Sequence, residues 1–570
     1  MGSPARWMGR LLAAAALAGL HAGALAGQGA VPDSMARRLD AVFARYDRPN
    51  SPGCTLGVYR DGRVVYAKGY GSGNLELGAP LTPASVFDIG STSKQFTAMS
   101  VLLLAREGKL GLDDEVRRYV PSLPSYGAPI TIRHLLHHTS GIRDYTTLFT
   151  LAGERTENWT TDDDALDLIV RQRALNFPPG SQWQYSNSGY FLLSLVVERV
   201  SGQSLRRFAH ARIFQPLGMT HSHFHDDHGM VVPNRATGYV AADSAGPFRI
   251  EMSDFEQTGD GSVFTTVEDL LQWDENFYSA RVGGPAVLAR MIQPGKLDGG
   301  DPLDYAAGLF VGTYRGLQTV EHGGSWAGYR SQLLRFPTQH VSVACLCNLG
   351  TADPDGLAQE VADIYLADRL GPRDGQAEGD GDSAGASAVT LPPERLRAAV
   401  GTYRDSTRGA VARIVLAGRK LELRYSGAAI ELRPVSATEF RPIGFDARLR
   451  LVPGRSGSPR RISLSGPGLG ETTFEAIVPV RPSAAGLDSL VGEYFSPELR
   501  STYRIVMERG ALVLHARNLP TAKLEPTLRD EFEYPVYGLT LRFTRRAGRV
   551  DGFTLAAGRT QGLRFERRSR

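Results

Sequence analysis

The 570-residue sequence predicts an α+β domain, an antiparallel sheet with flanking helices, followed by two tandem antiparallel β-barrel-like domains. Strand-like runs stand at both ends of residues 27–370, with helical segments between them, which favours one sheet joining the first and last segments. Residues 371–390 are rich in Gly, Asp, Ser and Ala, a composition typical of a flexible linker. Residues 391–481 and 482–570 then repeat one pattern at a displacement of 91 (487 minus 396).

The N-terminus, residues 1–26, has the features of a secretory signal peptide. Arg6 and Arg10 precede an apolar run over 11–20, and Ala24-Leu25-Ala26 supplies small residues for cleavage. The run is too short to span a bilayer as a stable helix. We therefore expect a periplasmic or secreted protein without stable membrane insertion.

Composition indicates an ordinary folded protein. Hydrophobic residues make up 42% and charged residues 22% of the chain, and the formal net charge is +4. Removing the two Arg of the signal leaves +2, so neither nucleic acid nor anionic lipid is implied as a partner.

Four strand-like runs frame the first domain. Two near its start are joined at Asp61-Gly62, a dipeptide typical of a β-hairpin. The other two precede a predicted helix over 354–369. The four runs are 54–60, 63–70, 329–336 and 341–348.

The two C-terminal copies alternate apolar and polar residues over short runs separated by glycine turns. Such runs, as in 421–425, are typical of small antiparallel barrels. The repeat is clearest at the start of each copy, where Leu396, Val400, Gly401 and Tyr403 recur as Leu487, Val491, Gly492 and Tyr494.

A Ser and a Lys three residues apart, Ser91 and Lys94, stand at the start of a predicted buried helix. Apolar residues follow at dense spacing from Phe96 to Ala105. Residues i and i+3 share a helix face, so the amine lies beside the hydroxyl. Burial there can lower the pKa of the Lys and let the neutral amine take the serine proton. The alternative is an exposed Lys after an ordinary helix cap.

A second motif, Tyr185-Ser186-Asn187, follows the turn-forming Pro178-Pro179-Gly180 and precedes a helical stretch over 190–200. This places the motif on a short connecting segment. A phenol and an amide two residues apart can face one cavity, where the phenol moves a proton and the amide orients a substrate. The alternative is a packed ring beside a turn.

The third motif, His322-Gly323-Gly324, follows a strand-like run over 318–321. Its two glycines let a substrate backbone approach the strand edge closely. His322 could donate a hydrogen bond to the substrate or titrate near neutrality. The alternative is a glycine-rich bulge before the next strand.

In these three motifs the chain resembles the serine β-lactamase and penicillin-binding-protein superfamily, in its branch of class C β-lactamases, D-Ala-D-Ala carboxypeptidases, D-aminopeptidases and family VIII esterases. The likeness runs over residues 33 to 370 and includes the segments 132–142, 216–219 and 261–270. It implies a β-lactamase/transpeptidase-like fold for the first domain. The arrangement with two barrels resembles the D-aminopeptidases, in which a loop from a C-terminal domain helps shape the active site. The sequence does not identify that loop.

The resemblance also implies roles. Ser91 would be the acylated nucleophile and Lys94 its activating partner, while Tyr185 would relay the proton to the leaving group and later activate water. Asn187 would contact the substrate amide. The backbone N–H groups of Ser91 and Ser325 would form the oxyanion hole.

The third motif departs from the family pattern. Most β-lactamases carry Lys-Thr-Gly where this chain has His322-Gly323-Gly324, and that Lys helps hold the substrate carboxylate, a contact that a neutral His reproduces poorly. Similar His-x-Gly versions occur among the D-aminopeptidases and esterases. The substitution therefore argues against efficient β-lactam or D-Ala-D-Ala carboxypeptidase activity.

The resemblance predicts an exported serine hydrolase that forms a covalent acyl-enzyme on short peptides or amides, in the manner of a D-aminopeptidase. Three alternatives stay open: a carboxylesterase of the same fold, a weak β-lactamase or D-Ala-D-Ala carboxypeptidase, and a non-catalytic protein that binds peptidoglycan fragments. The expected partner is a small molecule or short peptide. The sequence does not predict the oligomeric state.

The three cysteines, Cys54, Cys345 and Cys347, do not indicate a disulfide framework. The second and third alternate on a predicted strand and point to one face. We interpret all three as buried, inert thiols.

Histidines cluster in two other places. The run His221, His223, His225, Asp226, Asp227 and His228 has residue types that suit zinc or nickel. Because the motifs above need no metal, we expect a solvated loop, with no metal and no cofactor. His134, His137 and His138 are interpreted as packing or hydrogen-bonding residues.

Overall fold

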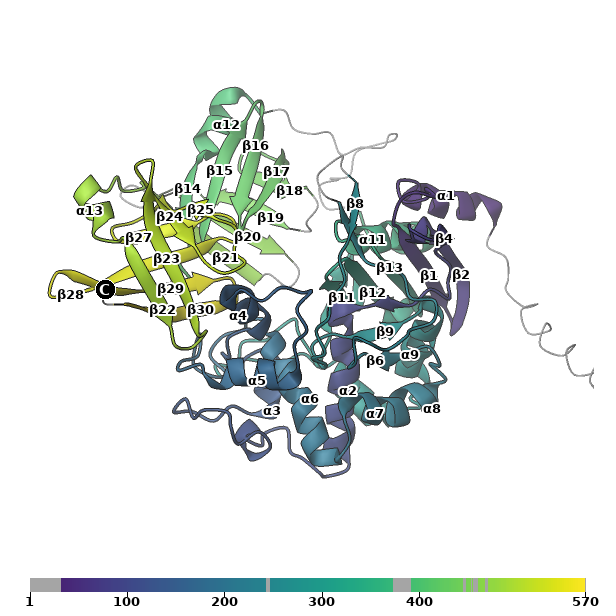
Figure 1. Ribbon diagram of the computed structural model, residues 1–570. Coiled ribbons are helices and arrows are strands. Elements are labelled where there is room, and N and C mark those ends of the chain that lie inside the picture. The colour runs from purple at the N-terminus through teal and green to yellow at the C-terminus, as the bar shows by residue number, and fades with distance from the viewer. Residues whose placement is uncertain are drawn as a thin grey trace, which may run out of the picture.

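The computed structural model describes residues 32–241, 247–372, 391–443, 447–452, 454, 460–466 and 470–568. The predicted signal peptide, and all but the first two residues of the predicted linker, lie outside those residues. Within the described part, no helix combines the length and apolar character needed to cross a bilayer. Figure 1 shows the first domain at the right and the two barrels at the left.

A six-stranded antiparallel sheet organises the first domain, in the order β10-β11-β12-β13-β1-β2. The β1–β13 pairing joins the first strand of the sheet along the chain to its last, as the order of elements predicted. The β1–β2 turn is Asp61-Gly62, and both residues have positive φ, which suits a two-residue hairpin. The strands are β1 (Cys54–Arg60), β2 (Arg63–Tyr70), β10 (Phe310–Tyr314), β11 (Leu317–Trp326), β12 (Tyr329–Phe336) and β13 (Val341–Cys347).

Helices cover both faces of this sheet, because its strands are apolar on both sides. α1 (Asp33–Phe43) and α11 (Pro354–Tyr365) pack on one face, over Val58 and Val343. α9 (Val267–Ser279) and the helical lobe pack on the other, against Ala344. The other helices are α2 (Lys94–Arg106), α3 (Ile132–Leu136), α4 (Tyr145–Ala152), α5 (Asp162–Val170), α6 (Asn187–Ser201), α7 (Leu205–Ala209), α8 (Gln215–Leu217) and α10 (Gly284–Met291). Short strands are β3 (Ser72–Asn74), β4 (Ala79–Pro80), β5 (Phe87–Asp88), β6 (His223–Phe224), β7 (Tyr239–Ala241), β8 (Phe248–Ile250) and β9 (Val263–Thr265).

A disulfide joins Cys54 to Cys347, which face each other across the β1–β13 pairing with 4.0 Å between their Cα atoms. The prediction of three inert thiols is therefore wrong for two of them. The two residues are 293 positions apart, and only the sheet pairing brings them together. Cys345 stays a free, buried thiol.

Each C-terminal copy is a small antiparallel β structure, as the repeat predicted. The first, after α12 (Pro393–Ala399), is a closed barrel of β14 to β21. The second, after α13 (Ala484–Asp488), is a nine-stranded sheet, β22 to β30, that we call the second barrel. The Tyr403 hydroxyl donates to the Ala399 carbonyl, and the Tyr494 hydroxyl donates to Leu490 at the same displacement of 91 (494 minus 403).

The strands of the first barrel are β14 (Gly401–Arg404), β15 (Val411–Ala417), β16 (Lys420–Tyr425), β17 (Ala428–Pro434), β18 (Glu439–Pro442), β19 (Arg448–Val452), β20 (Arg461–Gly466) and β21 (Gly470–Ile477). Those of the second barrel are β22 (Gly492–Ser496), β23 (Ser501–Glu508), β24 (Ala511–His515), β25 (Ala522–Lys523), β26 (Glu525–Pro526), β27 (Glu531–Tyr534), β28 (Leu539–Arg546), β29 (Arg549–Ala557) and β30 (Thr560–Arg567).

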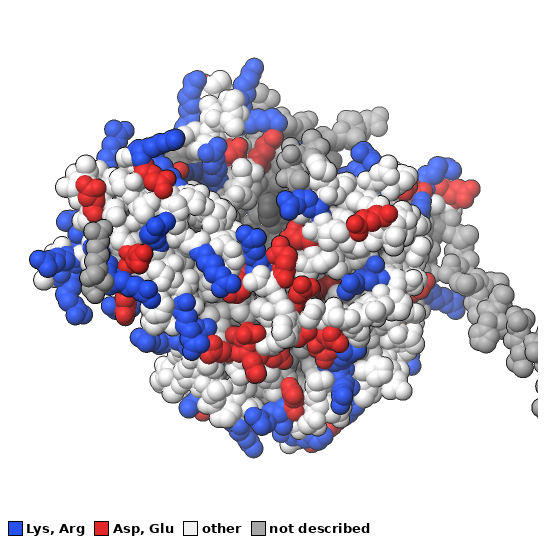
Figure 2. All heavy atoms as spheres, viewed as in Figure 1, with Lys and Arg blue, Asp and Glu red and all other residues white. Residues whose placement is uncertain are grey.

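The second barrel docks against the first domain beside α4 and α5. A buried ion pair joins Arg143 to Glu498 at 2.6 Å, with side chains only 1% and 4% exposed. The Tyr503 hydroxyl donates to the Leu151 carbonyl at 2.8 Å. On the face shown in Figure 2, basic and acidic side chains are interspersed over both parts. The buried Arg143–Glu498 pair and the Tyr503 hydrogen bond fix one docking position of the second barrel, because each of these groups would be costly to bury without its partner.

Candidate active site

The turn that presents Ser91 lies tightly against strand β11. A Cβ on Gly90, whose φ is +49°, would stand 2.8 Å from the Ser325 nitrogen, and one on Gly324 would stand 1.9 Å from the Ile89 carbonyl oxygen. Neither position accepts a side chain without moving backbone. The glycines therefore bring Ser91 and the Ser325 N–H to the same cavity, where both are lining residues.

Buried side chains hold this turn. The Gly90 N–H donates to an Asp88 carboxyl oxygen at 2.8 Å, and the Thr92 hydroxyl donates to the His322 carbonyl at 3.0 Å. Burial raises the pKa of Asp88 to about 7. These contacts tie the Ser91 turn to the third motif.

Lys94 is fully buried and points at Ser91. Its ammonium nitrogen lies 3.1 Å from the Ser91 Oγ, 2.9 Å from the Asn187 Oδ1 and 2.5 Å from the Asp260 carbonyl oxygen. Burial lowers the pKa of Lys94, and the nearby Asp260 carboxylate opposes the shift. The Lys94 amine and the Ser91 hydroxyl therefore lie close together, as predicted.

Tyr185 lies on the irregular segment before α6, and its ring packs 4.8 Å from the Lys94 ammonium. Its buried hydroxyl has no hydrogen-bond partner among the described residues, although Ser91 is near enough to oppose the rise in its pKa that burial causes. His138 packs against the ring at 4.3 Å, and its Nδ1 accepts from the Ser186 N–H. An unpartnered phenol beside Ser91 is available to a substrate.

Asn187 is the first residue of α6 rather than part of the connecting segment. Its backbone N–H donates to the Asp144 carboxylate at 2.7 Å, while its side-chain oxygen accepts from Lys94. Asp144 is fully buried at the start of α4 and also accepts from the Thr147 N–H at 3.1 Å. These contacts fix the Asn187 amide at the cavity, where it is a lining residue.

His322 is buried and has partners for both ring nitrogens. The Nδ1 lies 2.6 Å from the Gly323 carbonyl, so it donates, and the Nε2 accepts from the Tyr305 hydroxyl at 3.2 Å. Burial and the Lys94 charge lower the pKa of His322 to about 3. The ring is neutral at pH 7 and does not titrate near neutrality; its contact with substrate stays a prediction, as do the roles inferred for the other motif residues.

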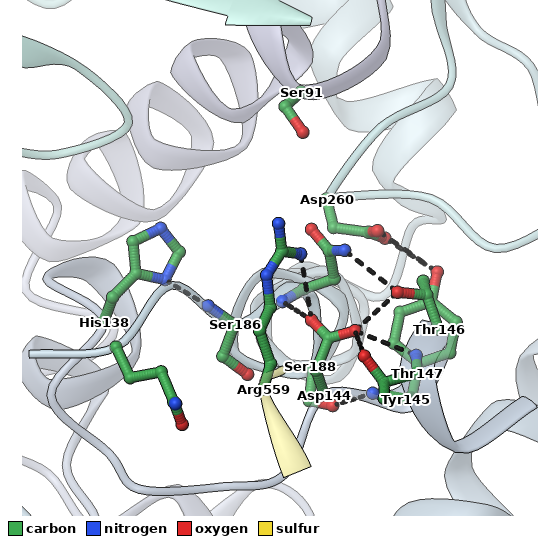
Figure 3. A network of polar contacts seen from close by, with 12 residues as sticks. Ser91, His138, Asp144, Tyr145, Thr146, Thr147, Ser186, Ser188, Asp260 and Arg559 are labelled. Atoms are coloured by element: carbon green, nitrogen blue, oxygen red, sulfur yellow. Dashed lines mark hydrogen bonds and ion pairs between the residues drawn. The ribbon is translucent and has the colours of Figure 1, made fainter. Parts of the chain in front are cut away.

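Arg559, in the turn between β29 and β30, enters the site from the second barrel. Its guanidinium lies 4.8 Å from the Tyr185 ring centre and 3.6 Å from the Asp144 carboxylate, in this view between that carboxylate and Ser91 (Figure 3). The Arg559 charge lowers the pKa of Asp144, although burial alone would raise that pKa. The backbone of the turn is held as well, because Asn176 donates to the Arg559 carbonyl at 2.8 Å.

The predicted histidine loop is partly structured. His223 lies in β6, and His225 is 6% exposed, so the interpretation of a solvated loop is wrong for these two. Asp227, His228 and Glu256 form an exposed or half-exposed group whose ligand atoms lie within 4.8 Å of one another. None of these three residues lines the cavity in front of Ser91.

Comparison with known proteins agrees with this geometry. The Beta-lactamase family model matches residues 39–366. A D-aminopeptidase of Gluconobacter oxydans is 30% identical over 413 residues, covering 71% of this chain and 73% of its own. A D-aminopeptidase of Cereibacter sphaeroides is 26% identical over 565 residues, covering 94% and 99%. The solved structure of an octameric penicillin-binding protein homologue from Pyrococcus abyssi aligns with a TM-score of 0.54 at 24% identity, over 78% of this chain and 99% of that one.

The fold and the Ser91–Lys94 pair define a serine hydrolase of the penicillin-recognising kind. The chain belongs to the Beta-lactamase family. Two relatives from Cereibacter sphaeroides strains, each aligned over 94% of this chain and 99% of its own length, are named D-aminopeptidases.

Proposed function

We propose that this protein is an exported serine amidase or aminopeptidase that cleaves short peptides or amides, with a preference for a D-residue at the N-terminus. The observation that carries the proposal is the buried Lys94 amine at 3.1 Å from the Ser91 hydroxyl. Burial lowers the pKa of Lys94 and so favours the neutral amine, which at that distance can act as a general base toward the hydroxyl.

The chemistry follows from these contacts. The neutral Lys94 amine accepts the Ser91 proton as Oγ bonds to the substrate carbonyl carbon. The resulting oxyanion accepts hydrogen bonds from the Ser91 and Ser325 N–H groups. The carbon–nitrogen bond then breaks, and the leaving amine takes the proton from Lys94 through the Tyr185 hydroxyl. Water attacks the acyl-enzyme, gives up its proton by the same route, and releases the acid and free Ser91.

Two features support the choice of substrate. The full-length relatives are named D-aminopeptidases, and they share the tail of two copies that follows the catalytic domain. The third motif supplies a neutral His322 in place of a cation, which disfavours substrates held mainly by a carboxylate at that position.

Export is supported by the signal-like N-terminus and by the Cys54–Cys347 disulfide, since such bonds persist in oxidising compartments. Fractionation of cells that express the full chain tests this. The protein should be recovered outside the cytoplasm, shortened at its N-terminus by about the length of a signal peptide.

A substrate panel tests the proposed reaction: D- and L-amino-acid p-nitroanilides, short-chain p-nitrophenyl esters and a chromogenic cephalosporin. We expect the D-anilides to give the highest kcat/KM, and mass spectrometry to find an acyl or fluorophosphonate adduct on Ser91. The S91A variant is the control. A clear preference for the cephalosporin, or equal turnover by S91A, would overturn the proposal, and a preference for esters would make the protein an esterase of the same mechanism.

A further inference from the structure

The cavity in front of Ser91 contains a carboxyl group in its lining. Ser91, Asn187 and Ser325 line the cavity, and Asp260 lines it with them. Among the described lining residues, Asp260 carries the sole formal charge. The cavity measures about 30 Å³, above the roughly 10–15 Å³ that one water molecule needs, so it admits a small polar group.

The Asp260 carboxylate is held in position. Both of its oxygens accept from the Tyr145 hydroxyl, at 3.1 and 3.2 Å, and its side chain is almost entirely buried. A carboxylate can accept about four hydrogen bonds, so Asp260 retains capacity for a further donor. Figure 3 shows Asp260 on the same side of the polar network as Ser91.

The cavity walls add to the attraction for a cation. Phe255 and Trp326 both line it, with ring centres 5.3 Å apart. Aromatic faces attract a desolvated ammonium group through their quadrupoles. A cavity lined by one carboxylate and two aromatic rings is a site for a small cation.

Lys94 is the nearest competing cation. Its ammonium group donates to the Asp260 backbone carbonyl, to Asn187 and to Ser91. Its charge also attracts the Asp260 carboxylate, which opposes the fall in the pKa of Lys94, but the two make no ion pair within 4.0 Å in the described structure. When Lys94 is neutral, as its role as a base requires, the Asp260 carboxylate has no cationic partner. Arg559 does not supply one, because its guanidinium lies against Asp144 and Tyr185.

We infer that Asp260 is the specificity-determining residue that binds the free α-ammonium group of the substrate's N-terminal residue. This inference rests on the proposed function and deepens it, since it explains why substrates would be cleaved one residue from a free N-terminus. A substrate whose amine is acylated would place a neutral, larger group against a buried carboxylate.

The test compares D-alanine p-nitroanilide with N-acetyl-D-alanine p-nitroanilide on the full-length enzyme. We expect the free amine to be preferred in kcat/KM by at least about tenfold, the value of a hydrogen bond between charged groups. D260N should reduce that preference by about tenfold or more, and D260E should retain more of it than D260N. D163N, an exposed carboxylate on α5, is the matched control and should leave the preference unchanged.

Two results would overturn the inference: equal kcat/KM for the two substrates in the unaltered enzyme, or an equal loss on both in D260N, which would mean that Asp260 acts through Lys94. If D260N does not fold by circular dichroism, inhibition of the unaltered enzyme decides the matter. D-Alaninol should inhibit at least tenfold more strongly than N-acetyl-D-alaninol, and equal inhibition would refute the site. Failure of the proposed function is distinguishable, because then neither anilide is cleaved and Ser91 takes up no fluorophosphonate.

Discussion

Replacing Arg559 by Met removes the positive charge that the second barrel brings to Lys94, and we expect the acid limb of the kcat/KM profile to move to higher pH. The Lys94 nitrogen and the Arg559 guanidinium carbon each lie 4.8 Å from the Tyr185 ring centre, so they are at most 9.6 Å apart (4.8 plus 4.8). At that distance and an effective dielectric constant of about 20, two charges repel by about 1.7 kcal/mol. The Arg559 side chain is 44% exposed, so screening reduces this to about 1 kcal/mol.

The sign follows from the base mechanism. Arg559 disfavours the protonated form of Lys94, so its removal raises the pKa of Lys94. The Asp144 carboxylate, no longer neutralised, acts in the same direction. The active, neutral amine then requires a higher pH, and the acid limb should move up by about 0.7 pH unit.

The assay is the pH dependence of kcat/KM on the best anilide substrate. R559K keeps the charge and should stay close to the unaltered profile. R564M, at an exposed position on β30, is a matched control that should not move the limb. An acid limb that stays in place or falls in R559M, with the fold intact by circular dichroism, would refute the reasoning.

Three further changes have definite expected outcomes. S91A should lower kcat on anilides by roughly 10³-fold or more, without loss of folding, since it removes the nucleophile alone. Replacing both Cys54 and Cys347 by Ala should lower the free energy of unfolding by about 2–5 kcal/mol in urea denaturation. E498A should cost about 3–5 kcal/mol, because it leaves the Arg143 guanidinium buried without its partner.

Controls separate these effects from general damage. Adding a reductant to the unaltered protein should lower its urea midpoint toward that of the cysteine variant, and an unchanged midpoint would contradict the disulfide's contribution. R500A removes an exposed ion pair with Asp167 at the same docking surface and should cost at most about 1 kcal/mol. If E498A costs no more than R500A, the buried pair is not what fixes the barrel.

Local features of the site follow from the sequence alone. The i, i+3 spacing of Ser91 and Lys94 is a property of one helical turn, so it predicted their contact without knowledge of the fold. The strand hairpin at Asp61-Gly62 is equally local, and the repeat of 91 residues predicted two similar C-terminal units. The two units match in detail at their start, because the Tyr403 and Tyr494 hydroxyls each donate to the carbonyl four residues earlier.

Long-range pairings account for what sequence reasoning missed. The Cys54–Cys347 bond depends on which strands become neighbours, and spacing along the chain carries no such information. Arg559 is a comparable case. Its one sequence signal is that the displacement of 91 places Gly468 at the corresponding position of the first copy (559 minus 91), so the residue type differs between the copies. Asp260 precedes the family-like segment 261–270 by one residue, and its role depends on the cavity.

The β29–β30 turn also affects the order in which the parts of the active site form during synthesis of the chain. Arg559 follows Ser91 by 468 positions (559 minus 91), so the residues around the nucleophile are not complete until the β29–β30 hairpin has been synthesised and has docked. Domains fold in order from the N-terminus as the chain emerges, and the first domain can form its sheet well before that moment. Any fragment that ends before the β29–β30 hairpin has Ser91 and Lys94 but lacks the charge beside them. The Ser91 site therefore acquires the Arg559 charge only after this hairpin has docked.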